Sequence, residues 1–65
     1  MESYQERVVE EKQALDLKLA KLVGFCGTRE FASLPTDEQR RMKRQWREME
    51  GYSEVLGERI DAFVK

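Results

Sequence analysis

The chain has 65 residues, a net charge of −1, one cysteine and no histidine. A domain this short buries only ~60% of its unfolded surface, and this composition excludes both a disulfide framework and a tetrahedral zinc site as a second source of stability. With 40% hydrophobic residues and both charge signs mixed, the chain is not disordered, and no apolar run reaches the ~18 residues of a membrane span. Self-association is the remaining common route to stability.

Charge is distributed unevenly along the chain. Residues 18–47 carry +5, whereas residues 1–17 and 48–65 carry −3 each, and the overall pI is about 5.5. A nucleic-acid-binding domain is usually basic as a whole, so we do not expect duplex nucleic acid as a partner. A small anionic ligand or an acidic protein surface fits the local basic segment better.

The first predicted helix runs from about residue 3 to about residue 25. Ser3 begins a capping-box signature at its N-terminus. Apolar residues then follow at helical steps of three and four, at Tyr4, Val8, Leu15, Leu19, Leu22 and Cys26. A charged residue, Glu11 or Lys12, interrupts this stripe. Gly24 and Gly27 indicate where the helix ends.

The connection covers about residues 27–35, and we expect one short helical turn between residues 28 and 34, with Phe31 and Leu34 closing the end of the core. Pro35 disfavours helix before it, and Thr36 with Gln39 has the signature of a second capping box. The second helix is predicted from about residue 37 to about residue 63. Its core stripe spans three heptads: Met42, Trp46, Met49, Ser53, Leu56, Ile60 and Phe63.

Ser53 is the only polar member of the second stripe. In an antiparallel hairpin with this connection it lies roughly opposite Lys12, so that the two polar interruptions share one layer. Such a layer is either a register device, as a polar core position is in coiled coils, or the floor of a small polar pocket. The predicted fold is therefore all-α, a single domain over residues 1–65 that forms an antiparallel two-helix hairpin.

Apolar residues also lie outside the two core stripes, at Val9, Leu17, Val23, Phe25, Tyr52, Val55 and Ala62. A two-helix hairpin cannot cover two apolar faces by itself. We therefore expect a homo-oligomer, either a dimer that forms a four-helix bundle or a larger helical ring.

The inventory of catalytic groups is missing from the sequence. Without histidine there is no conventional serine or cysteine triad, and no glycine-rich phosphate loop is present. The carboxylates are all expected on solvent-facing surfaces, and Cys26 is expected to be a small buried apolar residue. We therefore expect no enzymatic activity, no cofactor and no metal.

The run from Arg40 to Arg47 is the first candidate binding feature, because five of its eight residues are cationic. They lie in the first turns of a helix, where the helix dipole favours anions, so a bound phosphate would compensate for their placement. Arg41, Arg44 and Arg47 are the candidate phosphate ligands. The alternative is a solvated face whose arginines pair with neighbouring glutamates or with the acidic end of a partner hairpin.

The second candidate feature surrounds Tyr52. An aromatic face with Arg59 one heptad further along forms a workable clamp for a base and a phosphate. Gly51 and Gly57, which cost ~1 kcal/mol each inside a helix, would permit close approach of a ligand or, alternatively, a tight helix–helix contact in a dimer. Lys12 and Ser53 would join these residues in a pocket between subunits.

Four segments, 6–12, 15–19, 31–35 and 52–60, together resemble a family of very short proteins that tailed phages and prophages encode, crAss-like phages included. The most specific part is the pattern Tyr52, Leu56, Arg59, Ile60 and Phe63. The resemblance implies a phage origin and a helical fold, and no catalytic motif comes with it.

Phage accessory proteins of this size are often counter-defence factors. The leading hypothesis is a non-enzymatic, oligomeric sponge that sequesters a nucleotide immune signal in the bacterial host cytoplasm, without a membrane anchor. One alternative is a protein-binding inhibitor of a host defence enzyme, similar to an anti-CRISPR protein. The other is a small structural or regulatory phage protein.

Overall fold

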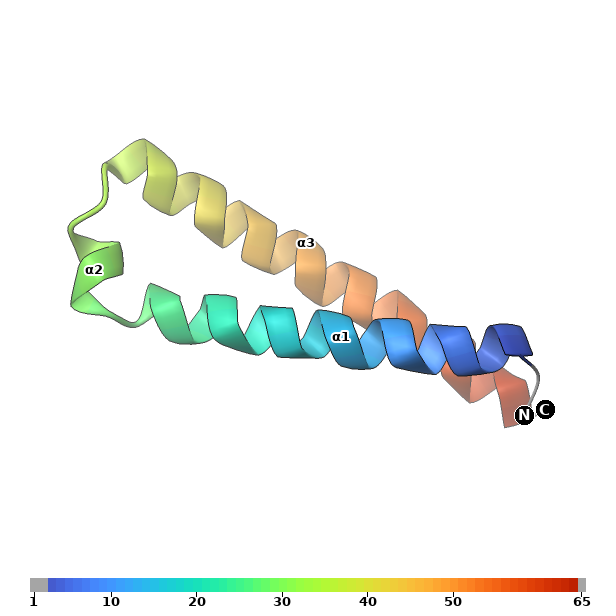
Figure 1. Ribbon diagram of the computed structural model, residues 1–65. Helices are drawn as coiled ribbons and strands as arrows, with labels where there is room; N and C mark the ends of the chain where they lie inside the picture. The colour runs from blue at the N-terminus through green and yellow to red at the C-terminus, as the bar shows by residue number, and fades with distance from the viewer. Residues whose placement is uncertain (1–2, 65) are drawn as a thin grey trace.

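The computed structural model describes residues 3–64, with side chains as far as Phe63. Two long helices, α1 (Ser3–Cys26) and α3 (Thr36–Asp61), run antiparallel and are joined by the four-residue helix α2 (Arg29–Ala32) (Figure 1). A short 3-10 helix, η1 (Ala62–Val64), continues α3. The predicted all-α hairpin with a helical turn in its connection is confirmed, and the observed helix ends lie within two residues of the predicted ones.

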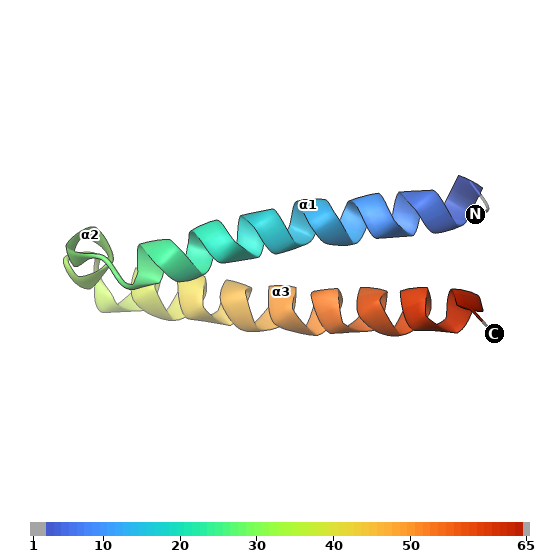
Figure 2. The same ribbon diagram turned by 90° about the horizontal axis from the view of Figure 1, so that it is seen from below.

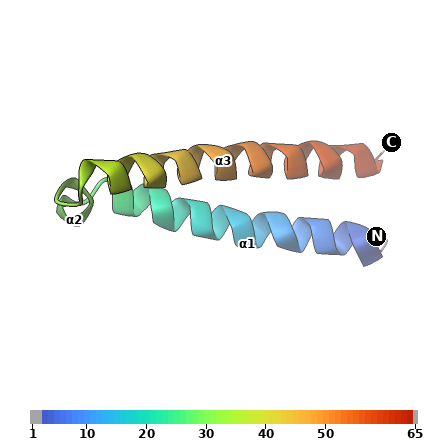
Figure 3. The same ribbon diagram turned by 90° about the horizontal axis from the view of Figure 1, so that it is seen from above.

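The hairpin is a rod of 47 × 14 × 14 Å. The two long helices lie side by side along its length, as Figures 2 and 3 show, and α2 closes one end. The start of α1 and the end of η1 lie together at the opposite end. Neither long helix has an apolar stretch that could cross a bilayer within residues 3–64.

The core of the rod is thin. Among the described side chains, four are buried: Val8, Phe31, Ser53 and Leu56. The other members of the two predicted stripes are half-buried, apart from Tyr4, which is 56% exposed. The contact surface of α1 is wider than predicted, because Val9 and Val23 are also half-buried. A core this small fits a chain that is marginal on its own.

Aromatic pairs close both ends of the rod. Tyr4 meets Phe63 edge to face at the chain ends, with ring centroids 5.8 Å apart. At the α2 end, Phe25 meets Phe31 edge to face at 6.2 Å, and the Nζ of Lys43 lies 5.8 Å from the Phe31 ring centroid. These contacts place Phe31 as the plug at the α2 end that the sequence predicts.

Thr28 caps α2 and ties it to the end of α1. Its Oγ1 accepts a hydrogen bond from the backbone N–H of Phe31 at 3.2 Å and donates one to the carbonyl of Phe25 at 2.6 Å. Its extended backbone, with φ −95° and ψ 165°, is typical of an N-cap residue. One side chain therefore links the end of α1 to the start of α2.

The capping box predicted at Thr36 and Gln39 is wrong. Thr36 is the first residue of α3, and Pro35 occupies the N-cap position without a side-chain cap. The amide of Gln39 instead donates to the carbonyls of Ala32 at 3.1 Å and Leu34 at 2.9 Å. Because these two carbonyls at the end of the connection would otherwise lack partners, Gln39 serves the loop rather than the start of its own helix.

Two further end signals differ from the prediction. Gly24 does not end α1 but lies within it, because the helix continues to Cys26. Gly27 follows the last helical residue, and its N–H donates to the carbonyl of Gly24 at 3.2 Å. At the other end Ser3 is already part of α1, so it does not hold the N-cap position that the predicted capping box gives it, and the residue before it lies outside the described range.

Phe31→Ala tests the plug at the α2 end. Removing a buried phenylalanine side chain costs about 3 kcal/mol, which is a large share of the stability of a chain this small. Urea unfolding followed by circular dichroism should show this loss. Leu17→Ala is the control, because Leu17 is 67% exposed and its truncation should change the unfolding free energy by less than about 0.5 kcal/mol. Equal effects of the two changes would contradict the plug.

Candidate functional site

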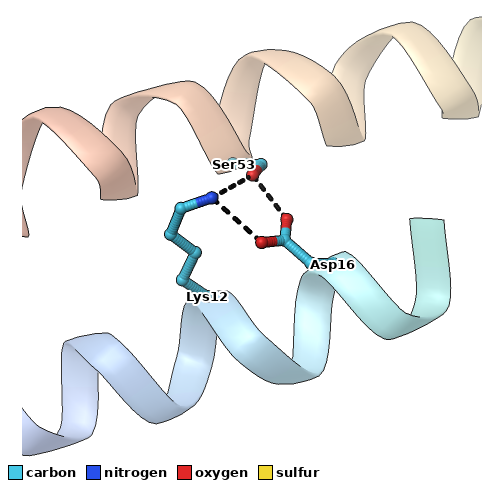
Figure 4. A network of polar contacts seen from close by, with 3 residues as sticks. All are labelled: Lys12, Asp16 and Ser53. Carbon is cyan, nitrogen blue, oxygen red and sulfur yellow. Dashed lines mark hydrogen bonds and ion pairs between the residues drawn. The ribbon is translucent and has the colours of Figure 1, made fainter. Parts of the chain in front are cut away.

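A triangle of polar contacts joins the two long helices near the middle of the rod (Figure 4). The ammonium of Lys12 donates to Ser53 Oγ at 2.9 Å and to Asp16 Oδ2 at 2.9 Å. The hydroxyl of Ser53 donates to Asp16 Oδ1 at 2.6 Å. The predicted opposition of Lys12 and Ser53 is thus confirmed, and we call these three residues the polar layer.

The polar layer is buried at Ser53 and exposed to solvent at Lys12 and Asp16. Ser53 is only 8% exposed, whereas the side chains of Lys12 and Asp16 are 30% and 45% exposed. The aliphatic chain of Lys12 lies beside Gly57, where an added Cβ would stand 3.6 Å from Lys12 Cε, an ordinary contact. No pocket opens in the described part of the chain. Of the two readings of this layer, the hairpin favours the register device over the floor of a pocket.

Asp16 was missed at the sequence level, where all carboxylates were expected on solvent-facing surfaces. It is half-buried and completes the polar layer. One signal could have found it. Residues four apart on a helix are neighbours, so Asp16 shares a face with Lys12, the residue that interrupts the core stripe.

The polar layer also holds Asp16 in its ionised form. The hydrogen bond from Ser53 and then the one from Lys12 lower the pKa of this carboxyl below its ordinary value of 3.8, against a smaller opposing effect of desolvation. Because water reaches both charged groups, the ion pair adds little net stability. What the layer adds is a preference for one register: the two bonds of Ser53, to Lys12 and to Asp16, cross between the helices and form only when residue 12 stands opposite residue 53.

The predicted arginine ligands fall into two classes. Arg41 pairs with Glu38 at 2.8 Å and Arg44 with Glu48 at 3.2 Å, both on exposed surface, as the solvated-face alternative expects. Arg47 has no ion pair within residues 3–64, and neither has Arg59. The latter two residues are exposed and have no acidic partner among the residues that the structure describes.

A single hairpin brings only some of the candidate residues together. Lys12 and Ser53 are bonded to each other. Tyr52, which is 46% exposed, and Arg59 lie on one stripe of α3, two turns apart. Arg41 is 18 residues before Arg59, or about 27 Å along the helix at ~1.5 Å per residue. One small ligand cannot reach both ends of that span in one chain.

Because of this register, the basic and acidic segments of the sequence lie at opposite ends of the rod. Since residue 12 stands opposite residue 53, residue 18 stands level with residue 47, and the basic segment 18–47 fills the α2 half. Residues 3–17 and 48–64 fill the other half and together carry −6, against +5 in the α2 half. The rod is therefore basic at the α2 end and acidic at the end where the chain starts and finishes.

The protein is therefore a small helical hairpin without a pocket in its described part, and the groups it offers to a partner are exposed cationic, aromatic and apolar side chains. The chain belongs to the Sequestin family, whose model matches residues 2–62. The family name points to a sequestering, and hence binding, role. No curated protein and no solved structure matches the chain.

Ser53→Ala tests the contribution of the polar layer to stability. The change removes two of the three contacts, and their loss outweighs the better helix propensity of alanine. The free energy of unfolding should fall by about 0.5–1 kcal/mol in chemical denaturation. Ser33→Ala is the matched control, because the hydroxyl of Ser33 is exposed and bonds only to the nearby carbonyl of Glu30. An unchanged Ser53 variant would show that the contacts do not stabilise the hairpin.

The lowered pKa of Asp16 predicts a pH dependence. A carboxyl whose pKa is lower in the folded state contributes stability that is fully present above its ordinary pKa of 3.8 and is lost as the pH falls through the lowered value. Asp16→Asn should therefore lower the Tm at neutral pH, and the difference from the parent should shrink in strong acid. Glu10→Gln, at an exposed position, should show no such trend. A difference that stays constant with pH would contradict the assignment.

Proposed function

We propose that this protein is a non-enzymatic phage counter-defence factor, a self-associating hairpin that binds a nucleotide immune signal in the bacterial cytoplasm and holds it out of reach of its receptor. The observation that carries the proposal is the family match over nearly the whole chain, to a family whose name denotes sequestration. Sequestration needs affinity and stoichiometric amounts but no catalytic group, which suits a chain without histidine.

The exposed surface supplies groups suited to a nucleotide. Guanidinium groups bind phosphate through paired, charge-assisted hydrogen bonds, and Arg47 and Arg59 have no carboxylate partner in the described chain. An aromatic ring stacks on a base, and Tyr52 stands two turns before Arg59 with nearly half its surface exposed. Arg41 and Arg44 would exchange an exposed glutamate for a phosphate, at little cost because such surface pairs are weak.

The polar layer has a supporting role in this proposal. Lys12 and Ser53 are already bonded to each other and to Asp16, so they fix the height of Tyr52 and Arg59 on the rod. Lys12 retains one N–H that neither Asp16 nor Ser53 receives, which a ligand oxygen at a subunit junction could accept.

A rival function has one observation in its favour. Leu17 is 67% exposed and lies on α1, whereas the candidate arginines and Tyr52 lie on α3. An exposed leucine suits an inhibitor that docks on a host protein through an apolar contact. A host protein recovered in stoichiometric amount with the purified chain, and lost with Leu17→Ala, would favour that function.

Calorimetry against a panel of cyclic oligonucleotides and cyclic ADP-ribose isomers tests the proposal. At least one member should bind with a Kd below about 10 μM, or about −7 kcal/mol. Arg59→Ala and Tyr52→Ala should each weaken that binding about 10-fold or more, because a charged hydrogen bond or a stacked base is lost. Lys21→Ala removes an exposed cation from α1 and should leave affinity unchanged. No binding to any member of the panel would contradict the proposed function.

A further inference from the structure

No contact among the described residues of one hairpin requires a glycine at position 51. It lies in the middle of α3, where glycine weakens a helix, and its backbone is exposed. A Cβ added there would meet nothing within 4 Å among the described residues. Gly57, by contrast, lies beside the Lys12 side chain. An open glycine at this position is suited to the close approach of a second backbone.

Gly51 belongs to an exposed stripe on the outer face of α3, opposite the face that packs on α1. Each member of the stripe lies two residues before or after a member of the core stripe, which places it on the opposite side of the helix. The members are Arg40, Arg44, Arg47, Gly51, Val55, Glu58 and Ala62. Val55 is 52% exposed, and Tyr52 flanks the stripe. Three arginines occupy the part before Gly51, and one glutamate, Glu58, lies in the part after it, with Glu54 beside the stripe.

We propose that this outer stripe binds a second copy of the chain, with the two α3 helices antiparallel and crossing at Gly51. Pairing about residue 51 sets residue 44 level with residue 58 of the other copy, and residue 47 level with residue 55. Arg44 then exchanges its exposed pair with Glu48 for the partner's Glu58. Arg47 faces the partner's Val55 with the partner's Glu54 beside it, so in the dimer these two arginines contact the partner and leave phosphate binding to Arg41 and Arg59. The twofold axis repeats each contact, as in any isologous dimer.

Charge is what selects this partner and this orientation. Residues 36–47 of α3 carry +3 and residues 48–61 carry −4. Antiparallel pairing sets each basic half on an acidic half, whereas parallel pairing would set like charges side by side. Val55 and the open Gly51 backbone provide the apolar centre, where the helices approach most closely. Because the surrounding charges are exposed, the dimer should weaken as salt rises.

The same arrangement unites candidate ligand residues that one chain holds apart, a step that rests on the proposed function. Arg41, Tyr52 and Arg59 share one side of α3, and the twofold axis keeps that side of both copies together. The partner's Arg41 comes level with residue 61, two residues or about 3 Å along the axis from Arg59. Each Arg59 and the partner's Arg41 then flank a central pair of Tyr52 rings, which is an arrangement for a nucleotide that carries phosphates.

Sedimentation velocity of the ligand-free protein at low salt tests the dimer. The parent chain should dimerise. Gly51→Gln, which adds a bulky side chain with good helix propensity, should weaken dimerisation about 10-fold or more, while circular dichroism shows the helix content kept. Arg44→Glu should weaken it as well, and adding Glu58→Arg to that variant should restore it, because both symmetric pairs are re-formed with reversed signs. Lys21→Glu, an exposed charge reversal on α1, should have no effect.

Two results would overturn the proposal: a parent chain that stays monomeric up to about 1 mM, or a dimer that is indifferent to Gly51→Gln and not rescued by the reversed pair. Both are read without nucleotide, so they are separate from the calorimetric test. A dimer with these properties and no affinity for any nucleotide would support the interface and contradict the proposed function. Nucleotide binding by a strict monomer would do the reverse.

Discussion

The polar layer of Lys12, Asp16 and Ser53 holds α1 and α3 in one register, and most other properties of the rod depend on that register. The apolar stripe of α3 repeats every heptad, so sliding one helix by seven residues would still set apolar side chains on apolar side chains. Sliding would, however, separate the Ser53 hydroxyl from Lys12 and Asp16, which stay paired with each other within α1. A fully apolar layer would pack as well but would not distinguish these alternatives.

From this register follows the electrostatic shape of the molecule. Residues 18 and 47 stand level, so a basic segment in the middle of the sequence becomes one end of a rod, and two acidic segments far apart in the sequence become the other. The division also runs through α3, close to Gly51. The features that the hairpin does not use, an open glycine, an exposed valine and opposite charges on either side, therefore coincide on the outer face of α3.

Most of the fold could be predicted from periodicity, because the heptads of the second helix, the proline and the capping residues are local signals. That Lys12 lies opposite Ser53 could also be predicted, because each residue interrupts an otherwise apolar stripe. Asp16 was not found, since a carboxylate four residues from a lysine is more often a surface pair. Gln39 was assigned to a capping box, because local spacing cannot show that the carbonyls of the connection lack partners. The candidate ligand residues remain predictions, because no contact within the described hairpin tests them.

The register of the two helices is the premise on which the charge division, the outer stripe and the grouping of candidate residues all rest. Nuclear Overhauser effects between the Lys12 side chain and α3, measured on labelled protein in solution, test it most directly. Contacts from the Lys12 methylene next to the ammonium to Ser53 and to the Gly57 α-protons are expected. Contacts that centre one heptad away, at Trp46 or Ile60, would contradict the register and everything that depends on it.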